Sequence, residues 1–312
     1  MIGDQLRRIE TATQPILIEK IEAELNAIAN EQVPRVRTIF ILLASVALFV
    51  GLGLLTVPWS LVWILLLVLF LHELGHWIGM KLFGFRNLQM LFIPFVGAVV
   101  SGYETNPNRA KGAIILLLGP VPGIVLSQLC SVLYEATDTE TYIQLSDGFL
   151  AINLFNLIPL YPLDGGKLIA TIALRRAKSE MAFQSVTGAV LVSLAFMTTN
   201  AVVGLFLAGF LLIFVPAAYR ANLVADKLAH EIPSVRGSGL EPVAGPYLQK
   251  TLELLEPMLP ARQRQPDIVA LYVWAIWGRI RSTSLSSWTV VALLSVYLSS
   301  VCMGLVTIWE WD

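Results

Sequence analysis

Cysteine, histidine and charged residues are all scarce in this chain. Of its 312 residues only 2 are cysteines and 3 are histidines, and 14% are charged. The formal net charge is −1, so the sequence has no basic excess of the kind that binds nucleic acid. Cys130 and Cys302 do not have the spacing of a zinc-binding pair. We interpret both as buried apolar thiols, and a disulfide between them stays open as an alternative.

Hydrophobic residues, in contrast, make up 56% of the sequence and gather in long runs. A helix needs about 20 apolar residues to cross a bilayer, and most of the runs reach this length. The predicted spans cover residues 38–57, 60–81, 112–134, 146–161, 183–199, 201–219 and 286–309. The fourth of them is short. The sequence therefore predicts an all-α polytopic membrane protein with about seven transmembrane helices.

Lysine and arginine occur only in every second polar segment between these predicted spans. All 21 of them lie in four segments, residues 1–37, 81–111, 167–178 and 220–281. The loop over 135–145 has none and carries acidic residues instead. Because Lys and Arg are enriched in cytoplasmic loops, we expect a cytoplasmic N-terminus and an external C-terminus. We expect the protein to lie in the plasma membrane of a prokaryote.

The spans and the polar segments divide the chain into four predicted parts. Residues 1–37 form a cytoplasmic arm with an amphipathic helix, which lies either on the membrane or a partner, or on this protein's own cytoplasmic face. Residues 38–219 form a membrane-embedded core. Residues 220–285 form a cytoplasmic linker and amphipathic helices, and the glycine- and proline-rich stretch over 233–246 is the linker itself. Residues 286–312 form a C-terminal transmembrane helix.

One segment of the predicted core does not read as a span. Residues 88–103 contain Pro94 and Gly97 among many residues that favour β structure. They predict a short membrane-associated strand or hairpin, covered by protein because bare strand edges are not tolerated in lipid.

His72 and His76 lie four residues apart in the second predicted span, with Glu73 between them. Residues at i and i+4 share one helix face, so both imidazoles can bind the same metal ion. Glu73 can reach a water beside that ion. This is the H-E-x-x-H pattern of zinc metalloproteases. The third histidine, His230, follows the sixth span and is interpreted as a surface residue.

A catalytic zinc site usually takes three protein ligands, so one more is needed. The best candidate is Asp164, which follows Pro159 and Pro162 and precedes Gly165 and Gly166. The lysine and arginine pattern places Asp164 at the cytoplasmic end of its span, at a depth similar to that of the two histidines. The alternative for Asp164 is a helix cap. We predict one Zn²⁺ per chain.

Asn156, in the same run of residues, is a candidate catalytic group. A side-chain amide can donate to the oxyanion that forms when water attacks a peptide carbonyl. Asn153, one turn earlier, is a weaker candidate for this role, and an interhelical hydrogen bond is the alternative for Asn156. Residues 119–123, in the third predicted span, contain small residues and prolines. We expect them to pack against the active-site helices.

The two motifs together resemble those of the site-2 protease family of intramembrane zinc metalloproteases, peptidase family M50. That family combines H-E-x-x-H in one transmembrane helix with N-x-x-P-x-x-P-L-D-G in a later one. In this chain the two patterns run from His72 to His76 and from Asn156 to Gly165. The resemblance covers about residues 38–178.

The resemblance implies a role for each motif residue. His72, His76 and Asp164 would bind zinc, Glu73 would be the general base, and Asn156 would hold or polarise the scissile peptide. Residues 88–103 would pair with an unwound substrate.

The sequence thus predicts an intramembrane zinc metalloprotease that hydrolyses a peptide bond within or near the transmembrane segment of a membrane-protein substrate. Its expected partners are that substrate and the lipid bilayer. One alternative is a non-proteolytic metal-binding scaffold or chaperone, which would have no need for Glu73 as a base. Another is a transporter that uses intramembrane His and Asp as an ion path, which leaves the H-E-x-x-H spacing unexplained.

Overall fold

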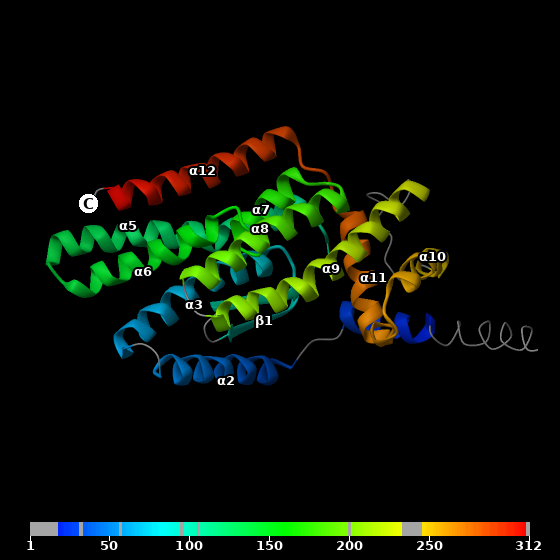
Figure 1. Cartoon of the computed structure of the whole chain (residues 1–312), viewed down its shortest axis with the longest axis horizontal. Helices are drawn as coiled ribbons and strands as arrows, with labels where there is room; N and C mark the ends of the chain where they lie inside the picture. Colours follow the sequence, from blue (N-terminus) through cyan, green and yellow to red (C-terminus); the bar gives the residue numbers. More distant parts are fainter. Residues whose placement is uncertain are drawn as a thin grey trace, which may run out of the picture.

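In the computed structural model the chain forms an elongated helical bundle that carries a cluster of shorter helices at one end (Figure 1). The structure describes residues 18–30, 34–55, 58–93, 97–104, 106–198, 201–232 and 245–309. A helix over 18–30 comes first. The longer helices are α2 (Arg35–Gly53), α3 (Trp59–Leu82), α5 (Pro120–Thr137), α6 (Glu140–Leu157), α8 (Ala177–Thr198), α9 (Ala201–Glu231) and α12 (Ser287–Trp309). The shorter ones are α4 (Arg109–Leu118), α7 (Asp164–Ala173), α10 (Gly245–Leu255), α11 (Pro266–Arg281), η2 (Glu256–Met258) and η3 (Ala261–Gln263).

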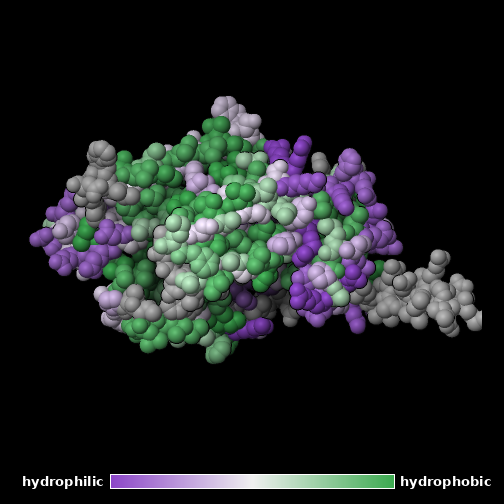
Figure 2. Space-filling model, viewed as in Figure 1, coloured by the Kyte–Doolittle hydropathy of each residue, from purple (hydrophilic) through white to green (hydrophobic). Residues whose placement is uncertain are grey.

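An apolar belt crosses the middle of the face of the molecule seen in Figure 2. Figure 2 shows hydrophobic residues across the centre of the visible face and hydrophilic residues at its two ends. Large apolar side chains point outward in this belt, and those of Phe40, Val186 and Leu212 are 71%, 64% and 77% exposed. Exposure on this scale suits contact with lipid rather than with water. The chain is a multi-pass membrane protein.

Six helical segments of the described chain are long and apolar enough to cross a membrane. They are Val36–Gly53, Trp59–Leu82, Arg109–Thr137, Ala177–Met197, Leu207–Glu231 and Ser287–Thr307. Each overlaps one of the seven predicted spans, and α4 and α5 together form the third.

The remaining predicted span, 146–161, corresponds to α6. This helix of 18 residues carries Glu140 and Asp147 and ends at Leu157, two residues before Pro159, and it is less apolar than the six spans. It nevertheless lies antiparallel against α5 and also contacts α3 (Figure 1). Protein neighbours therefore cover a large part of a helix whose own composition is marginal for lipid.

The predicted β segment is confirmed as an antiparallel hairpin of β1 (Arg86–Ile93) and β2 (Gly97–Tyr103). Phe92 of β1 packs edge-on against Phe49 of α2, with ring centroids 5.9 Å apart. Its backbone N–H donates to the Ser45 hydroxyl at 3.1 Å. The hairpin thus lies against α2 and α3, which satisfies part of its backbone in an apolar setting.

The N-terminal amphipathic helix lies in the cluster of shorter helices at the end of the bundle. Ile21 and Leu25 are fully buried among apolar residues of α9, α10 and α11, including Leu228, Leu248 and Trp277. The helix over 18–30 therefore packs on this protein itself. α9 runs through residue 219 without a break, so the predicted border between core and linker falls inside a helix. Most of the predicted linker, 233–246, lies outside the described residues.

Replacement of Leu25 by alanine should loosen this docking. Large-to-small changes of a fully buried leucine cost about 2–5 kcal/mol. Hydrogen exchange should show faster exchange of the amides over 18–30 in Leu25→Ala, and wild-type exchange in Glu24→Ala, an exposed position on the same helix. Equal exchange in the two variants would contradict the docked arrangement.

Candidate metal centre

The two histidines of H-E-x-x-H face inward from α3. His72, Glu73 and His76 are 4%, 7% and 7% exposed, although α3 itself is mostly apolar. The imidazole rings of His72 and His76 lie edge to face, with centroids 4.8 Å apart, and their Nε2 atoms are 3.2 Å apart. One helical turn therefore brings two nitrogen ligands to one point, as the spacing predicts.

Asp164 meets this pair from a segment 88 residues further along the chain. Its Oδ2 atom lies 3.1 Å from Nε2 of His72 and 3.0 Å from Nε2 of His76. Zinc–ligand bonds of about 2.0–2.2 Å in a tetrahedron separate the ligand atoms by about 3.3–3.6 Å. The three atoms are within a few tenths of an ångström of that spacing. Two imidazole nitrogens and one carboxylate oxygen are a donor set that zinc prefers, so these residues fit the metal.

The outer nitrogens of both rings are fixed by acceptors. Nδ1 of His76 donates to the carbonyl of Ile115 at 2.7 Å, since a carbonyl can only accept. Nδ1 of His72 donates to Oδ1 of Asn153 at 2.8 Å. The Asn153 amide nitrogen donates to the carbonyl of Phe149 at 2.7 Å, which fixes the orientation of that amide. Both Nε2 lone pairs are thereby left for the metal.

This network assigns Asn153 a role that sequence reasoning missed. We expected it as a weaker candidate for contact with a reaction oxyanion, but it is a fully buried partner of the candidate ligand His72. The sequence predicts which residues share a face of α6 with Asn153. It does not predict that this face packs against His72 of α3. Only the packing of the two helices reveals the pair.

The alternative reading of Asp164, as a helix cap, does not hold. The cap residue of α7 is Leu163, and Asp164 is the first helical residue. Its Oδ1 atom lies 3.6 Å from the ammonium of Lys167, one turn along α7, while Oδ2 faces the histidines. The carboxylate is buried and turned into the cluster.

Glycines after Asp164 permit a tight return of the chain. A Cβ atom on Gly165 would lie 2.1 Å from the carbonyl oxygen of Leu157, and one on Gly166 would lie 2.4 Å from the carbonyl carbon of Leu160. No side chain fits at such distances. The α6–α7 turn can therefore fold directly onto the start of α7, as the sequence indicates.

Residues 119–123 form a wall of the centre, which confirms the expected packing. A Cβ atom on Gly119 would lie 2.3 Å from Nε2 of His76, the atom that faces the metal position. A Cβ atom on Gly123 would lie 2.1 Å from the amide nitrogen of Asn153. The absence of side chains at these two positions leaves room for the ring and for an ion beside it.

Asn156 is not drawn into this network. Its amide nitrogen donates to the carbonyl of Ile152 in its own helix at 3.0 Å, and the side chain is half-buried. Its catalytic role stays a prediction.

A residue of α12 contacts the end of α6, where the hydroxyl of Tyr297 donates to the carbonyl of Leu157 at 2.7 Å. No sequence signal points to that contact.

The remaining sequence predictions concern residues away from the centre. His230 is exposed, as expected. Cys130 and Cys302 are both free thiols, which excludes the disulfide. Cys130 is buried as predicted, but Cys302 is exposed, so the prediction for it was wrong. α12 turns this residue outward, and apolar composition alone does not tell a lipid-facing position from a buried one.

Loss of the Asn153 side chain should weaken metal binding without removing a ligand. Partners that orient metal-binding histidines typically contribute 10–100-fold in affinity. We expect Asn153→Ala to bind zinc about that much more weakly in a competition titration with a chelator. Asn156→Ala, on the same helix, should bind zinc as the wild type does. Equal affinity in the two variants would show that His72 does not depend on Asn153.

A methyl group at residue 119 should be tolerated poorly. Gly119→Ala places an atom against the metal-facing nitrogen of His76, so we expect a large loss of bound zinc measured by atomic emission. Gly112→Ala is the matched control, because no atom lies within 4 Å of its added Cβ. Full zinc content in Gly119→Ala would mean that the ring can move away at little cost.

Comparisons with known proteins agree with this geometry. The chain is 34% identical over 122 residues to stage IV sporulation protein FB of Bacillus subtilis, a match that spans 38% of this chain and 42% of that protein. It is 28% identical over 120 residues to a zinc metalloprotease of Methanocaldococcus jannaschii, across 36% of this chain and 34% of that protein. The chain thus spans less than half the length of these curated relatives. No protein-family model matches it.

Two motifs in the expected order, three converging ligand atoms and two independent matches lead to the same assignment. The membrane-embedded core of this chain is similar, in its motifs and in the geometry of its candidate ligands, to the site-2 protease family, peptidase family M50.

Proposed function

We propose that this chain is an intramembrane zinc metalloprotease, which hydrolyses a peptide bond within or near the transmembrane segment of a membrane protein. The observation that carries the proposal is the convergence of His72, His76 and Asp164 within 3.0–3.2 Å of one another. Glu73 lies directly beside His72 on the same helix and is also buried. A site that only stored metal would have no need for this fourth ionisable group in an apolar helix.

Different residues of the chain have different roles in hydrolysis. Zinc, when bound, supplies Lewis-acid chemistry that polarises a peptide carbonyl and makes water nucleophilic near neutral pH. Glu73 takes the proton of the attacking water and then passes it to the leaving amine. His72 and His76 remain neutral ligands, because their Nδ1 hydrogens are donated to Asn153 and Ile115. The base and the ligands therefore keep separate roles.

In this proposal Asn156 positions the substrate. Only one of the two amide hydrogens is needed for its bond to the Ile152 carbonyl, so the other can be donated to a peptide oxygen. Such a donor aimed at the developing oxyanion lowers the barrier.

The substrate segment must also unwind, because a helix hides its carbonyls in hydrogen bonds. In a two-stranded sheet each strand has an edge that no other strand covers. We propose that the β1–β2 hairpin offers one of these edges to an extended substrate.

We also propose the orientation of the chain in its membrane. Contacts join all four basic segments at one end of the bundle. Arg86 donates to the carbonyl of Ala29, Arg109 donates to carbonyls at the end of α7, and Arg279 donates to the carbonyl of Arg175. Their gathering on one side supports a cytoplasmic location for this end, which includes the helix over 18–30. The membrane proposed is the plasma membrane of a prokaryote.

The variant Glu73→Gln tests the proposal most simply. It keeps the size of the side chain but removes its basicity, so we expect cleavage of a single-span substrate in proteoliposomes to fall by about 10²–10⁴-fold. Zinc content should not change. Glu140→Gln, at an exposed position on α6, should cleave as the wild type does.

Two outcomes would go against the proposal. Wild-type cleavage by Glu73→Gln would remove Glu73 as the base. A zinc-loaded wild type that releases no fragment from any single-span substrate would favour a metal-binding scaffold.

A further inference from the structure

A second polar site lies between the membrane bundle and the helices at its end. It is a cavity of about 910 Å³, which is within the size range of small-molecule sites. Residues of β2, α4, α7, α8, α9 and α11, and of the turns beside them, line it. None of the three metal ligands is among them. The charged side chains of the lining are Glu104, Arg109, Arg175, Glu180, Asp226 and Arg279.

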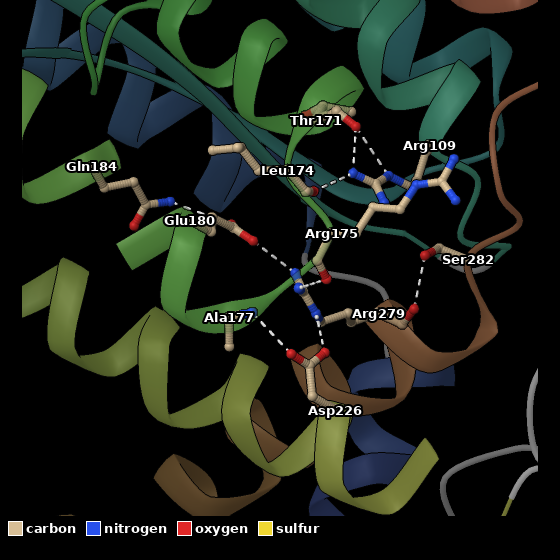
Figure 3. Close-up of polar contacts among 10 residues, drawn as sticks. All are labelled: Arg109, Thr171, Leu174, Arg175, Ala177, Glu180, Gln184, Asp226, Arg279 and Ser282. Carbon is tan, nitrogen blue, oxygen red and sulfur yellow. Dashed lines mark hydrogen bonds and ion pairs between the residues drawn. The ribbon is translucent and has the colours of Figure 1, made fainter. Parts of the chain in front are cut away.

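One of the three arginines is fully engaged. Arg279 of α11 pairs with Glu180 at 2.8 Å and with Asp226 at 3.3 Å, and it donates to the carbonyl of Arg175 at 2.7 Å (Figure 3). Asp226 also accepts from the backbone N–H of Ala177 at 2.8 Å. This network ties α11 and α9 to the turn between α7 and α8. It also occupies two of the three carboxylates of the lining.

Arg109 is fixed in place by neutral acceptors and forms no direct ion pair within the described residues. Its Nε donates to the carbonyl of Thr171 at 3.0 Å, and its Nη2 donates to the carbonyl of Leu174 at 2.7 Å and also to that of Thr171. These acceptors are neutral, and Nη1 takes part in none of these bonds. Across the described part of the chain, Arg109 has no ion pair with a carboxylate.

Arg175 brings a second such charge to the same cavity. Figure 3 shows its guanidinium extended toward that of Arg109, and the two positive charges repel each other. Within the described ranges the Arg175 guanidinium has neither a hydrogen bond nor an ion pair. Arg175 is exposed, and an anion that bridges the two guanidinium groups removes their repulsion.

The last carboxylate of the lining does not supply that counter-charge. Glu104 accepts from the backbone N–H of Asn108 at 2.9 Å, and the charges of Lys111 and Arg281 act on it. Burial raises the pKa of Glu104 above its ordinary value.

We propose that this cavity binds a phosphate-bearing ligand, whose phosphate oxygens accept hydrogen bonds from Arg109 and Arg175. Guanidinium groups present paired donors that match phosphate oxygens, and two of them balance the charge of one phosphate. Thr283 and Ser284 add hydroxyls to the lining. The source of the phosphate is either a phospholipid headgroup or a soluble phosphate compound. This inference is independent of the proposed proteolysis.

The position of the site connects it with the metal centre. Arg109 holds the carbonyls at the end of α7, and Asp164 is the first residue of that ten-residue helix. A ligand on Arg109 therefore binds one short helix away from the third metal ligand.

The test uses the full chain as wild type, Arg175→Gln and Arg176→Gln. Arg176 is the matched control, because it is exposed, adjacent and not part of the lining. One arm measures equilibrium binding of radiolabelled inorganic phosphate and pyrophosphate in detergent. The other arm counts phosphatidylglycerol molecules retained from nanodiscs by native mass spectrometry.

We expect one of the two arms to show a single bound phosphate group on the wild type. Arg175→Gln should bind it at least about tenfold more weakly, and Arg176→Gln should bind it within about twofold of the wild type. The arm that responds identifies the source. Absence of saturable binding in both arms would overturn the proposal. Equal weakening by the two variants would also overturn it, because diffuse surface charge would then explain the binding.

Discussion

The candidate metal centre depends on a single carboxylate oxygen that meets two imidazoles. Oδ2 of Asp164 lies 3.1 Å and 3.0 Å from the Nε2 atoms of His72 and His76. α3 alone provides the histidines, since one helical turn separates them. The aspartate must be delivered by a different helix at the same depth. Much of the surrounding fold therefore serves to hold the start of α7 against the middle of α3.

Two kinds of contact hold α7 in that place. At its start, the backbone of the α6–α7 turn folds against Gly165 and Gly166, where no side chain would fit. At its far end, Arg109 binds the carbonyls of Thr171 and Leu174. Buried polar groups in a membrane bundle are costly unless they are paired, so these contacts also limit where α7 can lie. The same arginine lines the cavity toward the end helices, which joins the two polar sites of the molecule.

Local sequence patterns predicted the parts of the site that depend on helix periodicity and backbone breaks. The spacing of His72 and His76 fixed their common face, the turn of prolines and glycines indicated where Asp164 would end its span, and Pro94 and Gly97 marked the hairpin. Six of seven predicted spans were found as apolar helices. The ligand set needed one more argument, that zinc takes a third ligand and that few carboxylates lie at the right depth.

The contacts that sequence reasoning missed all depend on which helices become neighbours. Asn153 binds His72 across 81 residues, and Tyr297 reaches Leu157 across 140. The outward position of Cys302 and the docking of Leu25 have the same origin, because an apolar residue is compatible with lipid and with protein alike. α6 was predicted as a short span, 146–161, but it is not among the six apolar segments, and contacts with α3 and α5 cover part of this more polar helix.

Zinc K-edge X-ray absorption of the metal-loaded protein tests the central claim most directly, since it reports the atoms bound to the ion. The account predicts two imidazole nitrogens and oxygen ligands at about 2.0–2.2 Å, with no sulfur. The spectrum of Asp164→Ala should lose an oxygen contribution or show no bound metal. A sulfur ligand, or a wild-type spectrum from Asp164→Ala, would contradict the convergence of these three residues on one ion.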